Sequence, residues 1–287
     1  MTVQGRDCTI TLKTQYREMG LPYAEETIRE AVSLLRENPA IEGDGNCGAI
    51  RNSAGVTGCV VTPLTIETVP LLFVLALGRS GVPVFVSETQ GLYRHTVNLS
   101  AMENGLRFDL IQERGAVRTL YEGCRVKGFE LRIMRGEAVK LKLDITGDQA
   151  PVTYAYPDRL SVIGGERFKE DGVRYRINGK EQTNIYGLTI ATRKEGGTQT
   201  EVWIHRVLED TAILPPLIES LEVTAQLYRD EYEYRSYGVF RLRLSRLVLM
   251  ADETDITSGD TVIGAVRFYC AGLFTADVFT ADEEVIE

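Results

Sequence analysis

Two neighbouring stretches of this sequence alternate strictly between apolar and charged residues, and this alternation constrains the fold more than any other feature. They are residues 129–133 and 139–145, with Arg135-Gly136-Glu137 between them. A period of two is typical of strands with one buried face, and glycine supplies the positive φ that a tight reversal needs. The sequence therefore predicts a β-hairpin. Its packed side holds Phe129, Leu131, Ile133, Val139, Leu141, Leu143 and Ile145, and its other side holds Glu130, Arg132, Lys140, Lys142 and Asp144.

Strand-like stretches recur along both halves of the chain. They occupy residues 105–112, 173–177, 186–192, 201–207, 220–228, 239–244 and 262–269. Turn-forming residues separate several of them, at Asn178-Gly179, Glu195-Gly196-Gly197 and Ser258-Gly259-Asp260. We therefore expect a mainly β fold, built as a barrel or a sandwich.

Two segments show helical spacing instead. Residues 23–37 place several apolar side chains near one helix face, and residues 65–77 begin with Thr65, a capping residue, and stop at Gly78. The apolar positions of the first segment are Ile28, Ala31, Val32, Leu34 and Leu35. We expect the second to be a short flanking helix whose apolar face closes one end of the barrel or sandwich.

The strand pattern is interrupted near the midpoint of the 287-residue chain. Residues 146–158 include Gly147, Pro151 and Pro157, so they are interpreted as the junction between an N-terminal β domain, residues 1–147, and a C-terminal one, residues 148–287. Both halves end in a strand, a turn and a second strand. Two interpretations follow: an internal duplication, or one continuous fold.

The net negative charge argues against a protein that binds nucleic acid tightly. The formal net charge is −9 and the sequence pI is about 5.0, whereas binding to phosphate backbones depends on clustered Lys and Arg. An acidic surface repels a polyanion. The balance therefore suits a conduit that DNA passes without specific binding, and it equally suits a protein whose charge serves solubility.

The cysteines and histidines predict neither a disulfide framework nor a zinc site, because the cysteines are odd in number, scattered and without a CxxC pair. They are Cys8, Cys47, Cys59, Cys124 and Cys270, with His95 and His205 as the two histidines. Residues 1–12 lack the apolar core of a signal peptide, so we expect the chain to stay in the cytoplasm. The longest apolar run, residues 69–77, is too short to span a bilayer. We expect no cofactor and no membrane partner.

Several segments, taken together in their order, resemble a known family. They are residues 55–60 (Gly-Val-Thr-Gly-Cys-Val), the helix ending in Leu75-Ala76-Leu77-Gly78, and residues 121–129 continuing to Gly147. Their order resembles that of the tail tube proteins, the major tail proteins of siphophage-type tails and related prophage particles. Residues 217–228 and the strands after them fit the same family, so the resemblance covers residues 50–275.

The resemblance implies a virion structural protein rather than an enzyme. Copies of the chain would form hexameric rings, or trimeric pseudo-hexameric rings if the two halves are repeats, and the rings would stack into a hollow tail tube for DNA ejection. Its partners would be further copies and other tail proteins such as the tape measure and terminator, assembled in the host bacterial cytoplasm. Glu130, Arg132, Lys140, Lys142 and Asp144 would then face the lumen or a neighbouring subunit, whereas in a monomer they would form a solvated sheet face. Loops at residues 87–94 and 249–260 are candidates for contact with the next ring.

Other functions are compatible with parts of the sequence. A baseplate, hub or tail-completion protein would use the same fold, and a monomeric carbohydrate-binding β domain would present exposed aromatic platforms. Asp44-Gly45-Asn46-Cys47 resembles the nucleophile motif of ovarian-tumour-type cysteine proteases, so Cys47 could serve as a hydrolase nucleophile with His205 as its base. The residues after Cys47 make a poor helix start, and a glycine-rich loop is the alternative interpretation of this motif.

Overall fold

A computed structural model of the chain describes residues 8–36, 49–87, 92–101, 105–155, 165–207, 214–230, 233–253 and 263–280. The described part is mainly β, and its only α-helix is α1 (Val69–Leu77). This confirms the predicted fold class of a mainly β protein with one short helix. Cys47, Pro157 and the predicted turn Ser258-Gly259-Asp260 lie outside the described residues.

The strands of the first half are β1 (Cys8–Lys13), β2 (Glu18–Leu21), β3 (Glu25–Glu26), β4 (Arg29–Arg36), β5 (Ala49–Pro63), β6 (Val84–Ser87), β7 (Leu92–Asn98), β8 (Phe108–Arg114), β9 (Val117–Met134) and β10 (Lys140–Gly147). Those that follow are β11 (Val152–Ala155), β12 (Val173–Ile177), β13 (Lys180–Gln182), β14 (Ile185–Arg193), β15 (Gln199–Val207), β16 (Leu217–Asp230), β17 (Glu233–Glu253), β18 (Ile263–Cys270) and β19 (Phe274–Thr280). A 3-10 turn covers Glu170–Gly172. The strand pairings in the described part of the chain are antiparallel.

The predicted hairpin is confirmed as the pair β9 and β10. Leu131 lies opposite Leu141, and Phe129 lies opposite Leu143. Gly136 in the connecting turn has a φ of 77°, a left-handed conformation that glycine adopts without a Cβ clash. The alternation thus predicted the two strands, and the glycine between them predicted the tight turn.

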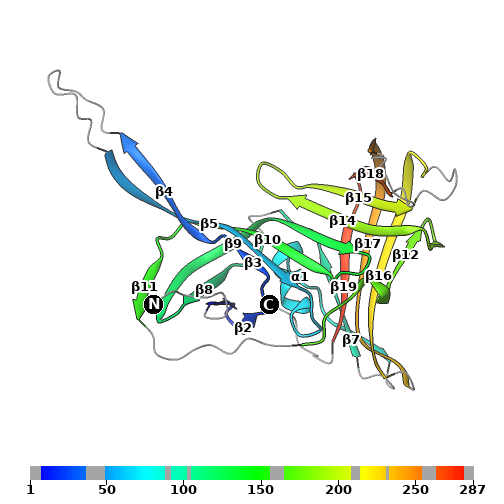
Figure 1. Cartoon of the computed structure of the whole chain (residues 1–287), viewed down its shortest axis with the longest axis horizontal. Coiled ribbons are helices and arrows are strands. Elements are labelled where there is room, and N and C mark those ends of the chain that lie inside the picture. The colour runs from blue at the N-terminus through cyan, green and yellow to red at the C-terminus, as the bar shows by residue number, and fades with distance from the viewer. Residues whose placement is uncertain are drawn as a thin grey trace.

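Strand β9 is shared by two sheets. Its first part pairs with β8 and β11, and its second part pairs with β10 and β14. A small sheet therefore has the order β2-β1-β8-β9-β11, and it lies on the left in Figure 1, joined through β9 to the larger body on the right.

The main sheet runs from the first half of the chain into the second without a break in hydrogen bonding. Its order is β4-β5-β10-β9-β14-β15-β18-β17. Strand β17 changes direction at Arg246, whose φ is 53°, so its earlier part pairs with β19 and its later part with β18. From β17 the sheet continues through β19 and β7 to β6, and through β16 and β12 to β13.

The sheet curves around one continuous apolar core. Phe129 of β9 and Phe274 of β19 face each other with ring centroids 6.0 Å apart, so strands far apart in the sheet order meet through their inner faces. Helix α1 is buried along its whole length and lies centrally in Figure 1. Phe73 of α1 packs edge-on against Phe240 at 5.2 Å. The helix therefore lies within the core on all its faces, whereas the sequence predicted that one apolar face would close an end of the barrel or sandwich.

The prediction of a helix over residues 23–37 is wrong, because β3 and β4 occupy this segment and pair with β5. The apolar positions fit helical spacing, but a fifteen-residue partner strand supplies backbone donors and acceptors along almost the whole segment. Tertiary pairing therefore overrides local spacing here.

The loops expected at residues 87–94 and 249–260 are described only in part. Strand β7 begins at Leu92 and β17 continues to Glu253, whereas residues 88–91 and 254–260 lie outside the described part. The junction at residues 146–158 holds the end of β10 and all of β11, and the pairing of β9 with β14 joins the strands on either side of it. The division into residues 1–147 and 148–287 remains a prediction.

Candidate functional site

The five charged residues predicted to share one side of the hairpin do lie together, on the side away from the core. Lys140 lies opposite Arg132 and Lys142 lies opposite Glu130 in the β9–β10 register, with Asp144 next along β10. Leu131, Leu141 and Leu143, which alternate with them along the two strands, are buried. Whether this outer face meets a lumen or a neighbouring subunit stays a prediction.

Most charges on this face are compensated by a neighbour. Lys140 Nζ lies 3.0 Å from Glu137 Oε2, Arg132 lies 3.6 Å from Glu137 Oε1, and Lys142 Nζ lies 3.5 Å from Asp144 Oδ1. The hydrogen bond from Lys140 lowers the pKa of the Glu137 carboxyl. These pairs are partly exposed, so each contributes little to stability, at most about 1 kcal/mol. They leave a polar face with little net charge of its own.

The outer face continues across β14, β15 and β18. The register places Arg132, Thr189, Trp203 and Arg267 in one row across four strands. Arg267 donates to Glu201 Oε2 at 2.7 Å, and its guanidinium lies 5.3 Å from the centre of the Trp203 ring. Trp203 and Arg267 were not among the predicted site residues, although the alternation in residues 201–207 could have placed Trp203 on the outer side.

His205 of β15 lies on this outer face, opposite Gly187 of β14. Its Nε2 is 3.4 Å from Thr189 Oγ1. Burial, followed by the nearby charge of Arg132, lowers the pKa of His205, so its ring is neutral at pH 7. The pairing of His205 with Cys47 remains untested, because Cys47 lies outside the described part.

At the β16–β18 end the outer face becomes apolar. Leu217 lies opposite Val248, and Val248 lies opposite Tyr269, so the register sets three apolar side chains side by side. Met250 follows in β17. We call these four residues the outer apolar patch; each is between 37% and 50% exposed.

A second exposed apolar surface lies on β6. Val84, Phe85 and Val86 are all exposed, as is Val82 just before the strand, and their exposed fractions lie between 43% and 83%. Successive residues of a strand point to opposite faces, so β6 is exposed on both. Among the described strands only β7 pairs with β6. We call these four residues the β6 edge.

The β4–β5 hairpin projects from the rest of the described chain (Figure 1). Strand β10 pairs with β5 only as far as Val56, opposite Gly147. Residues 49–53 of β5 pair only with β4 among the described strands. The outer end of this hairpin is therefore a two-stranded ribbon, an arrangement that is marginally stable without further packing.

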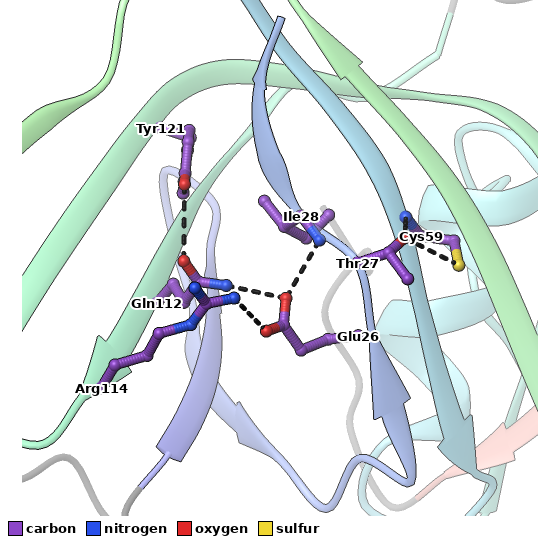
Figure 2. A network of polar contacts seen from close by, with 7 residues as sticks. All are labelled: Glu26, Thr27, Ile28, Cys59, Gln112, Arg114 and Tyr121. Atoms are coloured by element: carbon purple, nitrogen blue, oxygen red, sulfur yellow. Dashed lines mark hydrogen bonds and ion pairs between the residues drawn. The ribbon is translucent and has the colours of Figure 1, made fainter. Parts of the chain in front are cut away.

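A polar network joins the base of this hairpin to the small sheet (Figure 2). Glu26 Oε2 accepts hydrogen bonds from Gln112 Nε2 at 2.7 Å and from the backbone N–H of Ile28 at 3.0 Å. Glu26 Oε1 accepts from Arg114 at 2.5 Å, and the hydroxyl of Tyr121 donates to Gln112 at 3.4 Å. One carboxylate thus connects β3 with β8 of the small sheet.

Two glycines set the path of β5 at the same base. A Cβ at Gly55 would lie 1.8 Å from the carbonyl oxygen of Gly147, and one at Gly58 would lie 2.5 Å from that of Thr27. Beside them, Thr27 Oγ1 accepts from the backbone N–H of Cys59 at 3.0 Å. The glycines of residues 55–60, which contribute to the family resemblance, therefore have a packing role.

Cys124 and Cys270 are buried free thiols within the described part of the chain. Burial raises the pKa of the Cys124 thiol to about 12, helped by the charge of Asp109, and burial raises that of Cys270, so both are protonated at pH 7. No group of three or more His, Cys, Asp or Glu in the described part could hold a metal ion. His95 is buried in β7 and its Nε2 lies 2.9 Å from Thr280 Oγ1, as a hydrogen-bonded strand residue.

No α-helix within the described ranges has the length and apolar character needed to cross a membrane. A scan against models of protein families gives no match, and a search of curated proteins gives no significant relative.

Proposed function

We propose that this chain is a virion structural protein whose copies form the stacked rings of a phage or prophage tail tube. The observation that carries the proposal is that two edge strands of the main sheet, β4 and β6, each have a pairing partner on one side alone among the described strands. Only β5 pairs with β4, and only β7 pairs with β6, among the described strands. Open edges favour uncontrolled pairing with other chains, and a closed ring of copies would cover them.

The projecting hairpin supports the same proposal. Its outer part, where β5 pairs only with β4, has little of its own chain to pack against (Figure 1). A two-stranded ribbon gains stability when it packs on another surface. A neighbouring copy in a ring or stack would supply that surface.

The outer face also suits a passive conduit. Its charged side chains compensate one another through ion pairs, and the net charge of the whole chain is −9. Such a surface would let DNA pass without holding it. In this proposal Glu130, Arg132, Lys140, Lys142 and Asp144 face the lumen or a neighbour, no cofactor takes part, and the partners are further copies and other tail proteins such as the tape measure and terminator.

Negative-stain electron microscopy of the purified chain, with light scattering after gel filtration, tests the proposal. We expect rings or tubes with a central channel, and their symmetry separates a hexamer from a trimer of duplicated subunits. Single rings that never stack would favour a baseplate or hub protein. A stable monomer at high concentration, with Cys47 reacting rapidly with an electrophilic ubiquitin probe, would overturn the proposal in favour of a cysteine hydrolase.

A further inference from the structure

A cleft opens on the outer face of the sheet where β12, β16 and β17 run side by side, on the right in Figure 1. Arg176, Glu222 and Arg243 stand in one row across these strands. In the next row Ser220 lies opposite Ser245, and the small serine side chains leave the space open. The cleft has a volume of about 540 Å³, within the range of pockets that hold ligands. We call it the outer cleft.

Leu273 forms one wall of the outer cleft, in the turn between β18 and β19. Its side chain is 76% exposed, but its backbone is fixed by Ser245. The Leu273 N–H donates to Ser245 Oγ at 2.8 Å, and the Leu273 carbonyl accepts from the Ser245 backbone N–H at 3.0 Å. Ligand pockets combine apolar walls with a few placed polar groups, and the outer cleft has both.

Arg176 is a cation of the outer cleft with no close carboxylate partner. Its ion pair with Glu222 Oε1 is 3.9 Å long, beyond hydrogen-bond distance, and Glu222 is shared with Arg241 at the same distance. Glu181, which lies opposite Arg176 in the register, is 3.8 Å from Arg174. The Arg176 side chain is 52% exposed. It can therefore take a further carboxylate from outside.

The chain itself contains a segment of complementary composition. Residues 281–287, Ala-Asp-Glu-Glu-Val-Ile-Glu, follow β19 and lie outside the described residues. They hold four carboxylates and no basic side chain, and Val285-Ile286 stands between Glu284 and Glu287. Carboxylates pair with guanidiniums, and the two aliphatic side chains match the apolar wall at Leu273. We call residues 281–287 the acidic segment.

The acidic segment of one copy is poorly placed to fill the outer cleft of the same copy. Strand β19 runs from Phe274 to Thr280, so Leu273 lies at one end of it and the acidic segment leaves from the other. Seven residues at about 3.3 Å each give roughly 23 Å between Leu273 and Thr280. From Thr280 to Ile286 the chain spans at most about 22 Å, so it would have to reverse at once and run fully extended. The acidic segment of a second copy meets no such limit.

We propose that the outer cleft of one copy binds the acidic segment of a second copy, with carboxylates of the segment paired to Arg176 and Val285-Ile286 against Leu273. This inference rests on the proposed self-assembly and adds the surfaces that meet. The cleft and the segment lie at opposite ends of β19, so the contact is heterologous. Each copy offers one of each, and assembly continues into a closed ring or an open stack.

A synthetic peptide of residues 281–287 tests the contact directly. Its ends are acetylated and amidated, so that only the four side-chain carboxylates carry charge, and a fluorophore reports binding by anisotropy. The protein is the full chain with Asp282→Asn, Glu283→Gln, Glu284→Gln and Glu287→Gln, which we call the amide variant, because its own segment then competes less. We expect saturable binding that weakens as the salt concentration rises. A peptide with the same four amide substitutions should bind about tenfold more weakly or worse.

Two further changes to the amide variant locate the site. The cleft variant adds Arg176→Glu and Leu273→Asp, and we expect it to bind the acidic peptide about tenfold more weakly or worse. Arg243 is left unchanged, because it donates to the buried Asp277 at 2.6 Å. Arg176→Glu alone should prefer a peptide with lysines at the four acidic positions over the acidic peptide. A variant that had merely lost its fold would show no such reversal.

The matched control variant adds Arg135→Glu and Val152→Asp to the amide variant. These substitutions make the same change in charge as those of the cleft variant, at two exposed positions that do not line the cleft. The control variant should bind the acidic peptide like the amide variant. Far-UV circular dichroism checks that all variants fold.

The proposed contact is overturned if the acidic peptide fails to bind the amide variant, or if the cleft and control variants bind it equally. A short DNA strand that binds the outer cleft when the peptide does not would assign its arginines to a phosphate backbone, which also overturns the contact. Rings in electron micrographs of the unaltered chain would then leave the proposed function standing. An unaltered chain that stays monomeric overturns both proposals, because a contact between copies must join them.

Discussion

Lys194 donates a hydrogen bond from its Nζ to the carbonyl oxygen of Leu77, 3.2 Å away, at the C-terminal end of α1. The last carbonyls of a helix lack partners within the helix, and this one also accepts from the backbone N–H of Ser100 at 2.8 Å and from the Ser100 hydroxyl at 3.0 Å. Lys194 is only 3% exposed. It connects the helix to the end of β14 through a buried polar contact.

The buried Lys194 should make the free energy of unfolding depend on pH above pH 8. Burial lowers the pKa of Lys194 from 10.5 to about 8. Between these two values the unfolded chain binds more protons than the folded chain, so the contribution of Lys194 to stability rises as the pH rises from 8 towards 10.5. We expect Lys194→Met to lack this rise, which amounts to about 3 kcal/mol at most. Urea unfolding across this pH range measures it, with Lys180→Met at an exposed position as the control. Parallel curves for the Lys194→Met variant and the unaltered chain would contradict the prediction.

Removing the carboxylate at the base of the hairpin should weaken the link between β3 and the small sheet. Glu26→Ala loses the hydrogen bonds from Gln112, Arg114 and the Ile28 backbone, and it leaves the buried Gln112 amide without this acceptor (Figure 2). We expect a loss of about 2 kcal/mol in the free energy of unfolding, and faster hydrogen exchange at the Ile28 amide. The matched control is Glu25→Ala, because Glu25 is exposed and should change stability by less than about 0.5 kcal/mol. Equal effects of the two variants would show that the network contributes nothing.

A methyl group added at Gly55 should destabilise the fold far more than one added at another glycine of positive φ. The added Cβ of Gly55→Ala would overlap the carbonyl oxygen of Gly147 and force β5 away from β10. Gly136 also has a positive φ, but no atom lies within 4 Å of the site of its Cβ. We expect Gly55→Ala to destabilise the fold by more than about 3 kcal/mol and Gly136→Ala by about 1 kcal/mol, measured by thermal unfolding. Similar melting temperatures for both would exclude a close-packing role for Gly55.

The buried ion pair of the small sheet should contribute more to stability than the partly exposed ion pairs of the outer face. Glu113 pairs with Arg118, both nearly fully buried, and Thr9 donates to the same carboxylate at 2.6 Å. Glu113→Ala leaves the guanidinium buried without this partner, so we expect a loss of about 3–5 kcal/mol. Glu137→Ala, which removes the exposed partner of Lys140, should cost less than about 1 kcal/mol. Chemical denaturation compares the two, and a Glu113 variant as stable as the Glu137 variant would contradict the argument.

Features that depend only on neighbouring residues along the chain were predictable from the sequence. Alternation placed Phe129 and Leu141 inside and Glu130 and Lys142 outside, because successive strand residues point to opposite faces. Turn chemistry was equally local: Asn178 and Gly179 have φ values of 50° and 77°, which few other residue pairs adopt easily. The helix ending before Gly78 followed from a continuous apolar run and a stop signal.

Tertiary structure alone decided which strands pair. Residues 23–37 have helical spacing, yet they form β3 and β4 because β5 supplies a hydrogen-bonding partner for pairs such as Glu25 with Val61 and Arg36 with Ala49. The outer apolar patch has the same origin. Leu217, Val248 and Tyr269 lie far apart in sequence and become one surface only through the β16–β17–β18 register. Local sequence encodes the faces of each strand, whereas long-range register decides which faces combine into a site.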